Sequence, residues 1–185
     1  MCGITGFSNF KKSIENEFNN IVEMNDCLIH RGPDSCGYYK HKHVIFGHRR
    51  LSIVDPFGGS QPMTKKINGF NYTIVYNGEI YNTHIVKKNL LDEGYTFVTY
   101  SDTEVVLLSY IHYREDCVKH LNGIFAFSIF DEERKCIFIA RDHLGVKPIF
   151  YSIKDDYLIF GSEIKSMLKH PLVSSVVSRE GILDL

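Results

Sequence analysis

Most of the apolar sequence has the pattern of β-strands. ITGF (residues 4–7) opens the chain as a short apolar strand, and residues 38–55 are rich in β-branched and aromatic side chains. GIFAFSIFDEERKCIFIARD and PIFYSIKDDYLIFGSE each contain two apolar runs that flank a polar turn, at 131–134 and 154–156. Each of these two segments therefore predicts a β-hairpin, whose strands pair antiparallel.

Apolar residues at helical spacing predict helices in four other places. They recur in this way between about residues 13 and 28, over 84–93 before Gly94, after SDTE at 101–104, and in EIKSMLKH at 163–170. The helices come between sets of strands rather than after each strand. This order favours an α+β sandwich over a doubly wound parallel sheet. The sequence also contains no GxGxxG motif and no P-loop.

Composition and charge are those of an ordinary folded domain. The 185 residues are 44% hydrophobic and 23% charged, with a net charge of −1. This balance gives no electrostatic reason to expect nucleic acid or an anionic membrane as a partner. No apolar run approaches the roughly 20 residues that span a bilayer, and no charged segment followed by an apolar stretch predicts a signal peptide. The five cysteines, an odd number without CxxC, predict free thiols in a reducing cytoplasm.

Cys2 is the first candidate for chemistry. A cysteine near a strand is most often a small apolar residue. A thiol with a pKa near 8.5 needs a base at neutral pH, however, and removal of Met1 would give Cys2 a free α-amine with a pKa of about 7.7–8.0. That value suits a general base. Position alone favours the structural interpretation and leaves the nucleophile as the alternative.

The dipeptide Asn77-Gly78 interrupts NYTIVYNGEIYN, which otherwise has the pattern of two strands. Asn-Gly is typical of a type I′ hairpin turn, and this is the simpler interpretation. The alternative is an oxyanion hole, with the Asn77 carboxamide and the Gly78 backbone N–H as donors to one developing negative oxygen. A second Asn-Gly at 68–69 provides a comparison without chemical residues around it.

Two charged residues could bind the two charges of an amino acid. Arg50 would share a strand face with Ser52, and its guanidinium suits a carboxylate, although a solvated strand residue is the simpler interpretation. Ser101 and Glu104 fit a capping box, which places Asp102 in the first turn of a helix. There the helix dipole favours an acid without any function, yet Asp102 would be free to bind an ammonium.

Other catalytic or metal-binding patterns are weak. His41 and His43 would project from one strand face, but no third ligand follows at a convincing spacing, so we expect no metal site. A serine triad is not predicted either, because there is no GxSxG.

Taken together, nine ordered segments resemble the glutamine-hydrolysing domain of asparagine synthetases, a class II glutamine amidotransferase. They are MCGITGF, HRGPDSCG, GHRRLSIVD, GGSQPM, NGEIYN, SDTE, LNGIFAFSIFD, ARDHLGVKP and FGSEIK. The resemblance runs from Met1 to about Leu172. It implies the four-layer αββα sandwich of N-terminal nucleophile hydrolases, with two antiparallel sheets flanked by helices. It also implies a domain over 1–172, followed at 173–185 by the start of a linker or helix toward a synthetase domain.

The resemblance implies a role for each matching residue. Cys2, after removal of Met1, would be the nucleophile, with Asn77 and Gly78 as the oxyanion hole. Arg50 would bind the α-carboxylate of L-glutamine and Asp102 its α-ammonium. The glutamine pocket would be completed by the residues that flank them, Leu51, Ser52, Ile53, Val54 and Glu79. We further expect Arg31 and Asp34 to shape the loop near the nucleophile.

The resemblance also bears on cofactors and partners. The synthetase domain of the family carries an SGGxDS loop that binds pyrophosphate, and this sequence has none. We therefore expect no cofactor here, since ATP and Mg²⁺ would belong to a C-terminal or separate synthetase domain that receives the ammonia. A homodimer stays open. The alternatives are an amidotransferase domain for another acceptor, or a non-catalytic regulatory or interaction module of the same fold.

Overall fold

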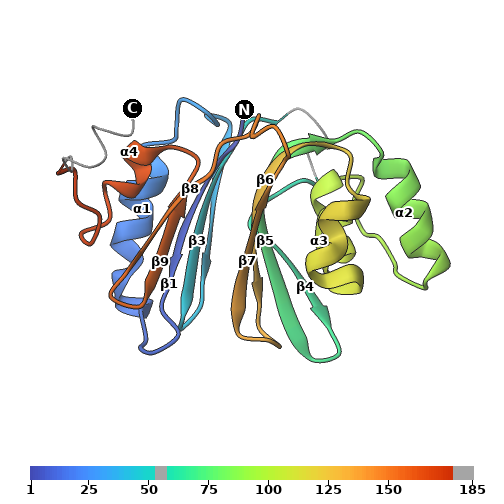
Figure 1. The fold of residues 1–185 in the computed structure, drawn as a ribbon, viewed down its shortest axis with the longest axis horizontal. Coiled ribbons are helices and arrows are strands. Elements are labelled where there is room, and N and C mark those ends of the chain that lie inside the picture. The colour runs from blue at the N-terminus through green and yellow to red at the C-terminus, as the bar shows by residue number, and fades with distance from the viewer. Residues whose placement is uncertain (53–57, 177–185) are drawn as a thin grey trace.

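Two antiparallel sheets lie face to face in the computed structural model, which describes residues 1–52 and 58–176 (Figure 1). The first sheet has the strand order β2-β3-β1-β9-β8 and the second has the order β4-β5-β6-β7. The strands of the first sheet are β1 (Gly3–Ser8), β2 (Ser35–Lys40), β3 (Val44–Arg50), β8 (Phe150–Lys154) and β9 (Tyr157–Gly161). Those of the second are β4 (Met63–Ile67), β5 (Phe70–Ile80), β6 (Gly123–Asp131) and β7 (Cys136–Arg141).

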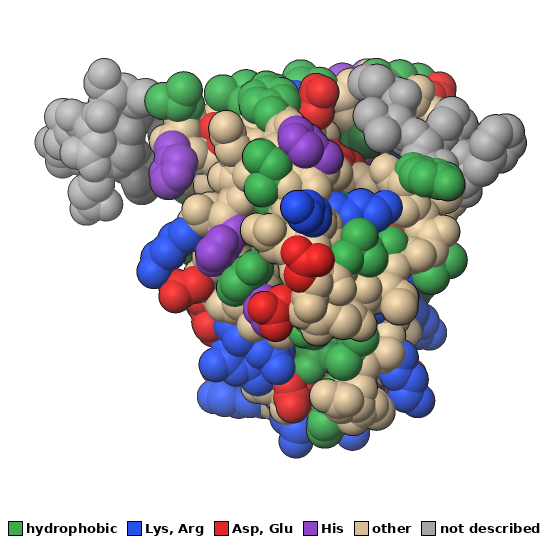
Figure 2. All heavy atoms as spheres, turned by 90° about the vertical axis from the view of Figure 1, so that its right-hand side faces the viewer, with side chains coloured by type: hydrophobic (Ala, Val, Ile, Leu, Met, Phe, Trp, Pro, Cys, Tyr) green, Lys and Arg blue, Asp and Glu red, His purple; other side chains and the backbone are tan. Residues whose placement is uncertain are grey.

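Helices cover the outer face of each sheet (Figure 1). The first sheet is covered by α1 (Phe18–Asp26) and α4 (Ile164–Met167), and a short 3-10 turn, η1 (Glu15–Glu17), leads into α1. The second is covered by α2 (Thr83–Asp92), α3 (Asp102–Tyr113) and η2 (Arg114–His120). Lys, Arg, Asp and Glu side chains are interspersed with apolar ones on the outer face of these last helices (Figure 2). The predicted α+β fold with four layers, αββα, is confirmed.

Three clusters of buried apolar side chains fill the spaces between adjacent layers. One lies between α1 and the first sheet, one between the sheets, and one between the second sheet and its helices. Strand β5 contributes to two of them, since Ile74 and Tyr76 belong to the outer cluster and Val75 to the one between the sheets. Both faces of β5 are therefore buried, and the burial is continuous from Tyr72 to Asn77.

The predicted elements are found with small shifts at their ends. The hairpins at 131–134 and 154–156 are the turns between β6 and β7 and between β8 and β9. Helix α2 ends before Gly94, which has a φ of +88°. Ser101 caps α3 as predicted, because its Oγ accepts from the Thr103 N–H at 3.2 Å. The capping box is incomplete, however, because Glu104 accepts from the Val98 and Thr99 N–H groups.

The simpler interpretation of Asn77-Gly78, a hairpin turn, is wrong. Strand β5 continues through both residues, which pair with Ala126 and Phe125 of β6. The turn between β4 and β5 is formed by the other Asn-Gly pair, Asn68 and Gly69, with φ values of 51° and 90°. A local turn signal at 77–78 is overridden because the long β6 partner holds that part of β5 extended.

Some predictions fall partly outside the described residues. Ile53 and Val54 lie there, as do residues 177–185 of the predicted linker segment. Over residues 1–52 and 58–176, no helix is long and apolar enough to cross a membrane.

Candidate active site

A cavity of about 120 Å³ lies where the start of β1 meets the ends of β3 and β5. The N-terminus lies at this end of the two sheets, at the top of Figure 1. The cavity brings together most of the predicted site residues, which come from segments far apart in the sequence: Cys2, Arg50, Leu51, Asn77, Gly78, Glu79 and Asp102. Ser52 is exposed and does not line this cavity.

Strand pairing positions Cys2. Gly3 pairs with Arg49 across β1 and β3, so the residue before Gly3 lies next to the end of β3. The Leu51 N–H faces the Cys2 sulfur, with 3.5 Å between N and Sγ. The Leu51 carbonyl oxygen lies 3.7 Å from the same sulfur and can accept the thiol proton.

Arg31 and Asp34 hold the loops around this cysteine. The Arg31 Nε donates to the Cys2 carbonyl at 3.0 Å, and its Nη1 donates to Glu163 at 3.0 Å. Asp34 accepts from the Ser52 N–H at 2.7 Å, which ties the segment after β3 to the loop before β2. The expectation that Arg31 and Asp34 shape this region is confirmed.

Asn77 and Gly78 lie on the cavity wall within β5. Asn77 is 2% exposed, and its Nδ2 has no hydrogen-bond partner in the part of the chain that the structure describes. A buried amide N–H without a partner costs free energy, so a ligand acceptor at this position would be stabilised. A Cβ on Gly78 would lie 2.5 Å from the Ile124 carbonyl oxygen, so only glycine allows this close approach to β6.

Asp102 receives two hydrogen bonds from β5. Its Oδ2 accepts from the Tyr76 hydroxyl at 2.6 Å and from the Ile80 N–H at 3.3 Å. Burial raises the pKa of the Asp102 carboxyl, and the hydrogen bonds from Tyr76 and Ile80 oppose that rise. Both of these donors, the Tyr76 hydroxyl and the Ile80 N–H, are neutral. A cationic group of a ligand would therefore complement the negative charge of the Asp102 carboxylate.

Arg50 ends β3 and is 7% exposed. Its backbone carbonyl accepts from the Asp34 N–H at 3.1 Å, which fixes the strand end at the cavity. Two residues earlier on β3, the ring of His48 lies between the sheets, with its Nε2 3.3 Å from the Tyr76 carbonyl oxygen. Complete burial lowers the pKa of His48 to about 4, so this histidine is neutral at pH 7.

Three further residues, to which the sequence alone assigns no role, also line the cavity: Gln61, Tyr76 and Lys147. The Gln61 side chain bonds both backbone groups of Tyr76, with its Nε2 3.0 Å from the carbonyl oxygen and its Oε1 2.6 Å from the amide. Lys147 Nζ lies 3.3 Å from the sulfur of Met1. Gln61 and Lys147 occur in segments that carried the resemblance, GGSQPM and ARDHLGVKP, but nothing local marked them as site residues.

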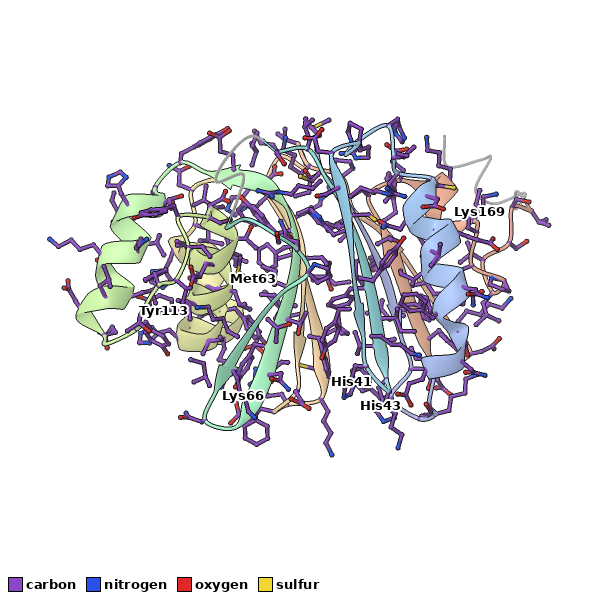
Figure 3. The ribbon with its side chains drawn as sticks, turned by 180° about the vertical axis from the view of Figure 1, so that it is seen from behind. His41, His43, Met63, Lys66, Tyr113 and Lys169 are labelled. Carbon is purple, nitrogen blue, oxygen red and sulfur yellow. The ribbon has the colours of Figure 1, made fainter. Side chains whose placement is uncertain are left out.

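His41 and His43 lie far from this cavity. Figure 3 shows both at the lower end of the sheets, opposite the N-terminus. Over residues 1–52 and 58–176, no group of three or more His, Cys, Asp or Glu side chains could hold a metal ion.

Comparisons with known proteins show the family to which the chain belongs. A family model described as a glutamine amidotransferase domain matches residues 1–185. Asparagine synthetase [glutamine-hydrolyzing] 3 of Bacillus subtilis is 50% identical over the whole chain, which spans 30% of that enzyme's length. The amidase chry2 of Gibberella zeae is 40% identical over 77% of the chain and 21% of its own length.

Solved structures share the fold. The glutamine phosphoribosylpyrophosphate amidotransferase of B. subtilis superposes with a TM-score of 0.71 over 89% of this chain and 42% of that chain, at 20% identity. This likeness agrees with the expected α+β sandwich fold. The family model matches the chain over all 185 residues, and half of these residues are identical to those of a glutamine-hydrolysing synthetase. The chain therefore belongs to the glutamine amidotransferase domain family.

Proposed function

We propose that this domain hydrolyses L-glutamine to glutamate and ammonia through a thioester on Cys2. One observation carries the proposal: Cys2 and Asn77 line the same small cavity, and the buried Nδ2 of Asn77 has no hydrogen-bond partner among the described residues. A nucleophile and a donor for the oxyanion are the two groups that acyl transfer from a carboxamide requires.

The first step is attack by the Cys2 thiolate on the side-chain carbonyl carbon of glutamine. After removal of Met1, the α-amine of Cys2 takes the thiol proton, directly or through a water. The Leu51 N–H, which faces the sulfur, favours the thiolate. The Asn77 carboxamide and the Gly78 N–H then donate to the oxygen that becomes negative.

The tetrahedral intermediate collapses by breaking its C–N bond. The protonated α-amine gives its proton to the leaving nitrogen, and ammonia departs from a thioester between Cys2 and the γ-carbonyl of the substrate. Water then adds to the thioester carbon, the thiol leaves, and glutamate is released. Nucleophile and base thus belong to one residue.

Two charged residues recognise the two charged groups on the α-carbon of glutamine. Arg50 binds the α-carboxylate with its guanidinium fork, and Asp102 binds the α-ammonium. The residues beside them, Leu51 and Glu79 on the cavity wall with Ser52, Ile53 and Val54 in the segment after Arg50, complete the glutamine pocket. A glutamine analogue that lacks either charge would then bind poorly.

We further propose that the ammonia serves an ATP-dependent synthetase domain that makes asparagine. Support comes from the relatives named as glutamine-hydrolysing asparagine synthetases, of which this chain matches less than half the length. The amidase relatives keep another acceptor open as the alternative.

Release of glutamate from glutamine by the purified chain tests the proposal. Intact mass must first show that Met1 has been removed. We expect hydrolysis by the wild-type chain and none above background with Cys2→Ser, in which an alcohol replaces the thiol. Equal activity of Cys2→Ser and wild type would refute the nucleophile. A folded chain that lacks Met1 and neither binds nor hydrolyses glutamine would favour the non-catalytic module.

A further inference from the structure

Tyr76 and Asp102 both line the cavity, and their side chains form a short hydrogen bond on its wall. The Tyr76 hydroxyl donates to Asp102 Oδ2 at 2.6 Å, and Tyr76 is 3% exposed. The Ile80 N–H donates to the same oxygen at 3.3 Å. Two donors on one oxygen restrain rotation of the carboxylate, so β5 fixes the orientation of Asp102 at the start of α3.

We infer that the Tyr76 hydroxyl is a positioning group for Asp102 and thereby determines the selectivity of the pocket for a substrate with an α-ammonium. This inference rests on the proposed function. Tyr76 does not need to touch the substrate, because it acts through the carboxylate that it holds.

The surroundings keep Tyr76 in place. The Gln61 side chain accepts from the Tyr76 amide at 2.6 Å and donates to its carbonyl at 3.0 Å. The Gln61 Nε2 also lies 3.3 Å from Thr103 Oγ1 in the first turn of α3. Gln61 therefore links β5 to the helix that carries Asp102, and the aromatic ring has little freedom to withdraw its hydroxyl.

The position of Tyr76 in β5 connects the two ends of the substrate pocket. Neighbouring residues of a strand point to opposite faces of the sheet. Tyr76 belongs to the apolar cluster on the α3 side, and the next residue, Asn77, is the proposed oxyanion donor. Because Tyr76 and Asn77 are adjacent in β5, one peptide unit separates the residue that holds Asp102 from the proposed donor to the reacting carbonyl oxygen.

The charge on Asp102 depends on this hydroxyl. Burial raises the pKa of Asp102, and the hydrogen bond from Tyr76 is the largest of the effects that lower it. Loss of the hydroxyl would leave Asp102 protonated, and unable to pair with an ammonium, up to a higher pH. Other titratable or charged side chains line the same cavity and belong in any analysis of the pH profile: Cys2, Arg50, Glu79 and Lys147.

Tyr76→Phe is the direct test, since it removes the hydroxyl and keeps the ring. Tyr110→Phe is the matched control, because Tyr110 is another buried tyrosine whose hydroxyl donates to an aspartate, Asp131, at 3.0 Å, away from the cavity. For Tyr76→Phe we expect a roughly 10- to 100-fold higher KM for glutamine with a similar kcat, and an acidic limb of kcat/KM displaced to higher pH. Tyr110→Phe should show neither change. Gln61→Ala, which loosens Tyr76 without removing its hydroxyl, should raise KM by a smaller factor.

Binding without chemistry separates this inference from the proposed function. In the Cys2→Ser background, calorimetry gives the affinities for glutamine and for glutaramate, the analogue that lacks the α-amine. We expect Tyr76→Phe to weaken glutamine binding and to leave glutaramate binding unchanged, so that discrimination between the two decreases. Equal discrimination with and without the hydroxyl would overturn the inference while the glutaminase stands. If the folded chain neither binds nor hydrolyses glutamine, the proposed function fails and this inference fails with it.

Discussion

The Leu51 amide nitrogen lies 3.5 Å from the sulfur of Cys2, across the ends of two paired strands. Because β1 and β3 pair with Gly3 opposite Arg49, the register of the sheet determines the position of Cys2, the proposed nucleophile. A backbone donor at this position stabilises the thiolate more than the thiol. In the proposed mechanism, the reactivity of Cys2 therefore depends on strand pairing as well as on its own α-amine.

Replacement of Asn77 by alanine should lower kcat far more than it changes KM. Its Nδ2 is buried without a partner among the described residues, and the loss of one oxyanion donor costs about 10²- to 10³-fold in rate. Steady-state release of glutamate measures the effect. Asn122→Ala, outside the cavity, serves as the control, and a normal kcat for Asn77→Ala would contradict the assignment of the oxyanion hole.

Gly78→Ala should disturb both the fold and the activity. The new Cβ would meet the Ile124 carbonyl oxygen at 2.5 Å and the Phe125 Cα at 2.8 Å, and neither backbone atom can move easily. Crowding of this kind costs about 1–3 kcal/mol in the free energy of unfolding. Thermal unfolding and glutamine turnover, measured together, test the expectation.

Gly69→Ala provides the matched control for that loss of stability. Gly69 has a φ of +90°, and a Cβ there would meet nothing within 4 Å. The strain of a left-handed residue costs about 1–2 kcal/mol, at a turn away from the cavity. Comparable destabilisation with normal turnover in Gly69→Ala would show that the activity lost in Gly78→Ala comes from the site.

The stability of the domain should decrease as the pH falls from about 6.5 to 4. Burial lowers the pKa of His48 from 6.5 to about 4, so over this range the unfolded chain binds a proton that the folded chain excludes. The full contribution of this histidine, present above pH 6.5, is about 3 kcal/mol. Urea unfolding at a series of pH values should show a smaller decrease for His48→Gln than for wild type, and parallel decreases in the two proteins would rule out His48 as a main source.

Activity should follow the removal of Met1. While Met1 is present, the Cys2 nitrogen is part of an amide and cannot act as the base, and the Met1 side chain itself lines the cavity. A preparation that retains Met1 should therefore fold and remain nearly inactive. Intact mass and turnover, compared across preparations with different degrees of processing, provide the measurement, and high turnover in fully unprocessed protein would exclude the α-amine as the base.

The sequence by itself determined the order and type of the main elements. The hairpins at 131–134 and 154–156, the capped start of α3 and the sandwich class all follow from local patterns of turn residues and apolar spacing. The resemblance of nine ordered segments also selects Cys2, Arg50, Asn77 and Asp102 as candidate site residues without any tertiary information.

Only the tertiary structure decided how those residues meet. Asn77-Gly78 has the local preference of a turn, but pairing with β6 over a long register keeps it within β5. The partners of Asp102 could not be predicted, because Tyr76 is 26 residues away and reaches it only when β5 packs against α3. Local sequence sets local conformation, whereas long-range pairing and burial determine which polar groups share a cavity.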